Sequence, residues 1–194
     1  MLHRDLINEA QLSYTSPALV KTGDEHQSGA VILIGIGGNL PNALYGPPRD
    51  ALSAALAQLE GGGVSVTFLS SWYRTEPVPR SEQPWFVNAV AALATHLSAL
   101  DLLARLQALE ARFGRRRGKP NAARVLDLDL LDYCGQTINT TSLVLPHPRL
   151  HLRRFVLAPL AEIAPHWRHP LLGLTAEQLL ARLAPDETVE RLPC

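Results

Sequence analysis

Runs of apolar residues along this chain follow two patterns, one typical of buried strands and one typical of amphipathic helices. The first run, Ala30–Ile36 (AVILIGI), is continuous and rich in β-branched residues, as expected of a buried strand. Residues 51–60 (ALSAALAQLE) carry apolar side chains at helical spacing and precede a glycine triplet. A second helix is predicted over 99–114, after the N-cap residue Ser98. Three further strands are predicted at Val64–Tyr73, Trp85–Thr95 and Val125–Tyr133.

The order of these segments is strand, helix, strand, strand, helix, strand, which is the split βαββαβ pattern of ferredoxin-like folds. We therefore predict an α+β domain with a mainly antiparallel sheet and both main helices packed on one face. Shorter helical patterns follow at Phe155–Ile163 and Thr175–Leu183, and the tail after Ala184 is predicted to be irregular. Residues 1–29 are polar, so we predict a flexible N-terminal extension at 1–29 and one domain at 30–194.

Composition narrows the class of protein. The 194 residues suffice for one domain with a full core, and 18 basic residues balance 18 acidic ones. This balance gives no global preference for nucleic acid or an anionic membrane, and no apolar window approaches the length of a membrane span. The first residues lack the apolar core of a signal peptide. We expect a cytoplasmic monomer that binds small molecules, with no nucleic-acid or membrane partner.

The strongest chemical signal is Asp127-Leu128-Asp129 in the last predicted strand. Residues two apart in a strand point to the same face, so the two carboxylates converge and repel each other unless a cation lies between them. Oxygen ligands favour Mg²⁺, which takes one or two protein carboxylates together with substrate phosphates. The alternative is a solvated edge strand with exposed aspartates, and spacing by itself does not separate the two.

A basic loop precedes these aspartates and strengthens the metal interpretation. Arginine side chains bind phosphate oxygens through paired N–H donors, so a polyphosphate nucleotide fits beside a Mg²⁺ site. For any single arginine, a solvated loop or nonspecific RNA contact is the simpler explanation. The loop contains Arg115, Arg116, Arg117, Lys119 and Arg124, and Arg153 and Arg154 join it if the chain returns nearby.

Two further signals are weaker. Trp85, Phe86 and Asn88 could bind a flat heterocycle, with the amide at its polar edge, although core packing explains the rings equally. His147 lies between two prolines and could donate to a phosphate or occupy a surface turn. Neither a Walker lysine motif nor the spacing of a dinucleotide-binding glycine motif is present, so a dinucleotide fold is disfavoured.

Seven segments in order resemble the 6-hydroxymethyl-7,8-dihydropterin pyrophosphokinase family, from Val31 to Leu183. The segment RVLDLDLL is the most diagnostic. The others are IGIGGNL, SSWYRTEPV, QPWFVNAV, ARFGRRR, LVLPHPRL and RRFVLAPLAEIAP. The resemblance implies a ferredoxin-like fold, two Mg²⁺ ions and ATP as co-substrate. It also implies transfer of pyrophosphate to the pterin hydroxymethyl group in folate biosynthesis, by attack on the β-phosphorus with release of AMP.

The resemblance also implies roles for individual residues. Asp127 and Asp129 would bind the metal ions, and with Arg115 and Arg124 they form the expected catalytic set. The expected nucleotide-binding residues are Gln107, Glu110, Arg117, His147 and Arg153. The expected pterin-binding residues are Thr75, Val78, Phe86, Asn88 and Phe155.

This sequence departs from the family pattern at several positions. Asn121 stands where many relatives have a tryptophan that closes over the pterin, and Glu76 stands where proline is common. Two other functions use similar features: an RNA-binding module, and a nucleotidyltransferase that would use the same aspartates but release pyrophosphate. The aspartates of the last predicted strand would repel RNA phosphates unless a metal is bound, and the product formed from ATP separates the two enzymes.

Overall fold

The computed structural model describes residues 31–115, 122–184 and 188–193, so the extension predicted at 1–29 lies outside the described residues. The helices are α1 Pro48–Leu59, α2 Ala99–Arg112, α3 Arg154–Ile163 and α4 Ala176–Arg182, with the short 3₁₀ helix η1 at Leu150–Leu152. The strands are β1 Ile32–Gly38, β2 Val64–Leu69, β3 Tyr73–Thr75, β4 Phe86–Thr95, β5 Asp127–Tyr133, β6 Ile138–Asn139, β7 Val144–Leu145 and β8 Val189–Arg191.

The main sheet has the strand order β5-β1-β4-β3-β8, and β2 pairs with β4 as well. Every pair of strands is antiparallel. With α1 between β1 and β2, and α2 between β4 and β5, the order β5-β1-β4-β2 is that of a ferredoxin-like unit. The predicted α+β ferredoxin-like fold is therefore confirmed.

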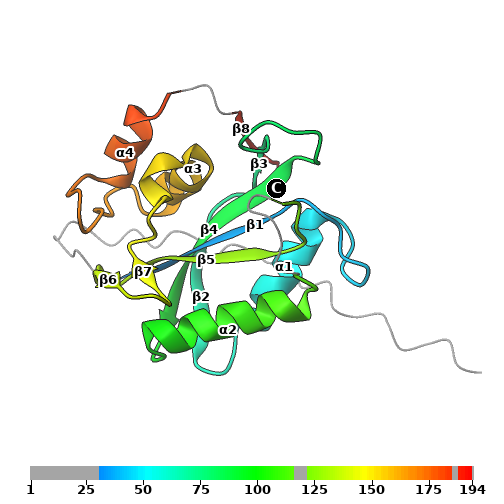
Figure 1. Cartoon of the computed structure of the whole chain (residues 1–194), viewed down its shortest axis with the longest axis horizontal. Helices are drawn as coiled ribbons and strands as arrows, with labels where there is room; N and C mark the ends of the chain where they lie inside the picture. The colour runs from blue at the N-terminus through cyan, green and yellow to red at the C-terminus, as the bar shows by residue number, and fades with distance from the viewer. Residues whose placement is uncertain (1–30, 116–121, 185–187, 194) are drawn as a thin grey trace, which may run out of the picture.

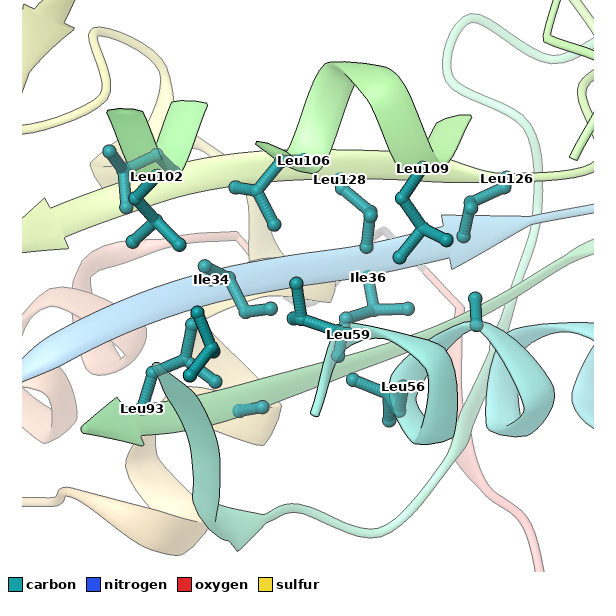
Figure 2. Packing of buried hydrophobic residues seen from close by; sticks show 14 of the residues in the cluster. Ile34, Ile36, Leu56, Leu59, Leu93, Leu102, Leu106, Leu109, Leu126 and Leu128 are labelled. Atoms are coloured by element: carbon teal, nitrogen blue, oxygen red, sulfur yellow. The ribbon is translucent and has the colours of Figure 1, made fainter. Parts of the chain in front are cut away.

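Helices cover both faces of this sheet (Figure 1). The two main helices, α1 and α2, lie on the same face, as predicted, while α3 and α4 cover the opposite face. Successive side chains of β1 supply both layers: Ile34 and Ile36 belong to the α1–α2 core, whereas Leu33 belongs to the α3–α4 core. Figure 2 shows the first of these cores, in which α2 contributes Leu102, Leu106 and Leu109.

The single strand predicted at Val64–Tyr73 is wrong, because two strands occupy this segment. β2 pairs with the second half of β4, and β3 pairs with its first residues, Phe86–Asn88. Between them, the Ser70 hydroxyl accepts a hydrogen bond from the backbone N–H of Val90 at 3.0 Å, and the Ser70 N–H donates to the Val90 carbonyl. This side chain takes the place of a backbone partner, so the chain changes direction without leaving a buried polar group unpaired.

The irregular tail predicted after Ala184 is also wrong in part. Residues Val189–Arg191 form β8, which pairs with β3 along Thr75 to Tyr73. Such a short segment has no hydrophobic period of its own, and it becomes a strand because β3 offers unpaired backbone groups at the sheet edge.

The C-terminal end of helix α2 lies beside the first residues of β5. Ser98 caps the helix by accepting a hydrogen bond from the N–H of Asp101, as the sequence predicted. The buried face of α2 contacts the sheet and ends at Leu109 and Glu110, next to Leu128. None of the helices in the described part of the chain is long and apolar enough to cross a membrane.

Candidate active site

A cavity of about 1080 Å³ opens at one edge of the sheet. Here the C-terminal end of β1 lies between the first residues of β4 and those of β5. Side chains from α2, the β3–β4 connection and α3 complete the walls. All of the predicted site residues that the structure describes line this cavity; Arg117, one of the predicted nucleotide-binding residues, lies outside the described residues.

Asp127 and Asp129 lie on the cavity side of β5, while Leu128 between them points into the α1–α2 core. Two arginines contact Asp127. The Arg124 Nη1 lies 2.6 Å from Asp127 Oδ2, and the Arg115 Nη1 lies 2.7 Å from Asp127 Oδ1. Asp129 has a looser contact, with Arg153 Nη1 at 3.6 Å from its Oδ2. The two aspartates of β5 are thus adjacent to three arginines that come from different parts of the sequence.

The environment of Asp127 fits a bound cation. Burial raises the pKa of Asp127, the charge of Asp129 raises it further, and Arg124 and Arg115 lower it. Asp127 Oδ1 is buried, and among the described residues no donor is oriented to form a hydrogen bond with it, although the Arg115 guanidinium is near. No set of three or more His, Cys, Asp or Glu side chains in the described ranges is placed to hold a metal ion. Mg²⁺ suits such a site because it keeps waters and substrate phosphates as its other ligands.

Glu110 connects α2 to this carboxylate–arginine cluster. Its Oε1 accepts a hydrogen bond from the Leu128 N–H at 2.7 Å, and the same oxygen forms an ion pair with the Arg115 guanidinium. Burial raises the pKa of Glu110 to about 7, and the nearby charge of Asp127 raises it, whereas the Leu128 N–H and Arg115 lower it. Glu110 therefore contacts both Arg115 and the backbone of β5, and it also lines the cavity. Its expected contact with the nucleotide stays a prediction.

The predicted pterin residues form the wall of the cavity next to β3 and β4. The Asn88 Nδ2 donates to Thr75 Oγ1 at 2.8 Å, and both residues are buried. A Cβ on Gly37 would lie 2.6 Å from Asn88 Oδ1, so a side chain at position 37 would displace the amide. Phe86 and Phe155 line the same region, and Val78 is half exposed at its mouth. A buried amide of set orientation beside rings suits recognition of a flat heterocycle.

The predicted nucleotide-binding residues that the structure describes line the same cavity, from α2 and from the segment between His147 and Arg153. The Arg153 guanidinium carbon lies 5.4 Å from the centre of the Phe155 ring, between the carboxylates and the aromatic wall. Burial lowers the pKa of His147, with Asp129 raising it and the neighbouring arginines lowering it. His147 Nδ1 accepts a hydrogen bond from the Arg149 N–H, so Nε2 carries the proton in the neutral ring. Gln107 lines the cavity from α2.

Gly37, Gly38 and Asn39 are not among the site residues predicted from the sequence. A Cβ on Gly38 would lie 2.3 Å from the Val125 carbonyl oxygen, so the backbones of β1 and the segment before β5 meet closely here. Asn39 is only 1% exposed, and it hydrogen-bonds to Arg124. The signal was present, since two glycines and an asparagine directly follow a buried strand.

Comparison with known proteins decides the family. Residues 33–165, more than half of the chain, match the profile of 7,8-dihydro-6-hydroxymethylpterin-pyrophosphokinase (HPPK). The chain belongs to the HPPK family. It is 41% identical over 152 residues to the 2-amino-4-hydroxy-6-hydroxymethyldihydropteridine pyrophosphokinase of Synechocystis sp., covering 78% of this chain and 75% of that protein. It is 40% identical over 163 residues to the enzyme of the same name from Pseudomonas aeruginosa, covering 84% of this chain and 96% of that protein.

A solved structure described as HPPK-DHPS in complex with substrates has the same fold, with a TM-score of 0.61 and 15% identity. The likeness covers 78% of this chain and 43% of that one. The match to the family profile and to the two bacterial enzymes confirms the family resemblance inferred from the sequence. This HPPK transfers pyrophosphate from ATP to 6-hydroxymethyl-7,8-dihydropterin in folate biosynthesis.

Proposed function

We propose that HPPK chemistry takes place in the cavity at the ends of β1, β4 and β5 and that it depends on Mg²⁺. The observation that supports this most directly is the cluster of Asp127 and Asp129 with three arginines at one end of the pocket. Asp127 and Asp129 would hold two Mg²⁺ ions together with the ATP phosphates. Such ions would lower the pKa of the attacking hydroxyl and balance phosphate charge when bound.

In this proposal, positioning and charge neutralisation carry the reaction. The pterin hydroxymethyl oxygen attacks the β-phosphorus of ATP and loses its proton to solvent. The bond between the β-phosphorus and the oxygen that bridges it to the α-phosphorus breaks, and AMP leaves with that oxygen. Arg115 and Arg124 neutralise charge on the transferring group, since paired guanidinium donors match phosphate oxygens.

The two sides of the cavity divide the substrates. Gln107, His147 and Arg153 face the nucleotide, and the protonated Nε2 of the neutral His147 ring donates to a phosphate oxygen. Glu110 acts on this side by orienting Arg115. Thr75, Val78, Phe86, Asn88 and Phe155 form the pterin side, where Asn88 binds the polar edge of the ring. We further propose that the protein acts in the cytoplasm. We also propose that it is a monomer, because all these groups come from one chain; gel filtration with light scattering checks the oligomeric state.

Product analysis tests this function. Chromatography of a reaction with ATP, the pterin alcohol and Mg²⁺ is expected to yield AMP and pterin diphosphate in equal amounts. EDTA should stop the reaction, and added Mg²⁺ should restore it. Free pyrophosphate in place of AMP would instead indicate a nucleotidyltransferase. Asp129→Ala should abolish turnover, whereas Asp50→Ala, an exposed aspartate on α1, serves as the matched control and should leave it unchanged.

A further inference from the structure

Asn39, directly after β1, hydrogen-bonds to two segments that are far apart in the sequence. One is the segment at Arg124, before β5, and the other is the segment 83–84, before β4. The Asn39 Oδ1 accepts a hydrogen bond from the Arg124 N–H at 2.8 Å, and its own N–H donates to the Arg124 carbonyl at 2.8 Å. Its Nδ2 donates to the Pro84 carbonyl at 2.9 Å and to Gln83 Oε1 at 3.2 Å. The side chain is almost fully buried, and it makes a hydrogen bond with each of its polar atoms.

These bonds link the two halves of the cavity. Arg124 precedes β5 and contacts Asp127 through its guanidinium, so its backbone position sets where that charge lies. Pro84 lies two residues before Phe86 and begins the approach to the pterin wall. The close contact between Gly38 and the Val125 carbonyl holds the same junction from the backbone side.

We propose that Asn39 is a positioning residue for pyrophosphoryl transfer, and that it acts through Arg124. This inference rests on the proposed function of the cavity. By fixing both the N–H and the carbonyl of Arg124, Asn39 holds the guanidinium beside the transferring phosphate group. Through Pro84, the same side chain sets the distance between that charge and the pterin wall. Asn39 contacts neither substrate in this proposal, so its effect on turnover requires the Arg124 side chain.

A double-mutant cycle on kcat tests this dependence. Asn39→Ala in the wild-type background is expected to lower kcat by about 100-fold, the effect of a misplacement of about 1 Å at a reacting group. In an Arg124→Ala background the same change should lower kcat less than about threefold, because the group that Asn39 positions is already gone. Equal losses in the two backgrounds would show a merely structural role and overturn the proposal, as would an unchanged kcat in Asn39→Ala.

A second variant separates the two arms of Asn39 and covers the case in which Asn39→Ala does not fold by circular dichroism. Asn39→Asp keeps the acceptor for the Arg124 N–H but loses the donor to Pro84. Its kcat should stay within about tenfold of wild type while KM for the pterin rises; a kcat loss of about 100-fold would contradict the positioning role. Asn42→Ala is the matched control, since the Asn42 side-chain amide oxygen accepts hydrogen bonds from the N–H groups of Leu44 and Tyr45 in the β1–α1 connection. Absence of AMP formation by the wild-type enzyme would refute the proposed function instead.

Discussion

Glu110 offers a sharp test of the electrostatics at this site. Its carboxylate is buried beside Arg115 and Leu128, and burial raises its pKa to about 7 from an ordinary value of 4.5. Each pKa unit corresponds to about 1.36 kcal/mol, so ionisation of Glu110 is about 3 kcal/mol less favourable in the folded protein than in the unfolded chain. Glu110→Gln keeps the shape and one acceptor oxygen but removes the charge.

The sign follows from proton binding. Because the folded-state pKa is raised, the folded protein binds more protons than the unfolded chain between about pH 4.5 and 7. The contribution of Glu110 to the free energy of unfolding is therefore most favourable at low pH and is lost as the pH rises through 7. Relative to Glu110→Gln, the wild-type enzyme should lose about 2.5 kcal/mol of stability between pH 5 and pH 8.

Urea unfolding of both proteins at pH 5, 6, 7 and 8, followed by tryptophan fluorescence, measures this difference. Glu177→Gln, an exposed glutamate on α4, is the control and should track the wild type throughout. Glu110→Gln should also lower kcat by about tenfold at pH 8, since Arg115 loses a charged partner that orients it. Parallel stability curves for wild type and Glu110→Gln, within about 0.5 kcal/mol at every pH, would refute the reasoning.

Three further predictions concern the metal site, the close approach of Gly38 to Val125, and the buried Asp132 beside the α3–α4 core. Asp129→Ala should abolish the thermal stabilisation that ATP gives in the presence of Mg²⁺ while melting normally without ligand; retained stabilisation would contradict the metal assignment. Gly38→Ala should lower the free energy of unfolding by about 1–3 kcal/mol, because its Cβ would lie 2.3 Å from the Val125 carbonyl oxygen. Gly35→Ala, whose Cβ would meet only a flexible leucine side chain at 3.5 Å, is the control, and equal losses would argue against this explanation. Burial raises the pKa of Asp132, so Asp132→Asn should gain stability over wild type as the pH rises above about 4, as thermal melts across pH would show; a constant difference would exclude this cause.

The helices, the main strands and the pair of aspartates at the candidate metal site were predictable because their sequence signals are local. Periodicity separates helix from strand, and the alternation of Asp127, Leu128 and Asp129 places both carboxylates on one face whatever the strand pairs with. The split of Val64–Tyr73 into β2 and β3, by contrast, depends on where Ser70 meets β4. Likewise β8 forms only because β3 provides an open edge.

The sequence by itself determined which residues could carry the chemistry: two aspartates on one face, arginines before them, and an amide among rings. Only the tertiary structure decided how those residues act on one another. Asn39 and Arg124 are hydrogen-bonded to each other although 85 positions separate them. The raised pKa of Glu110 arises because packing against β5 excludes water from its carboxyl group. Hydrogen bonds between distant segments and desolvation are properties of the packed chain, so no local pattern encodes them.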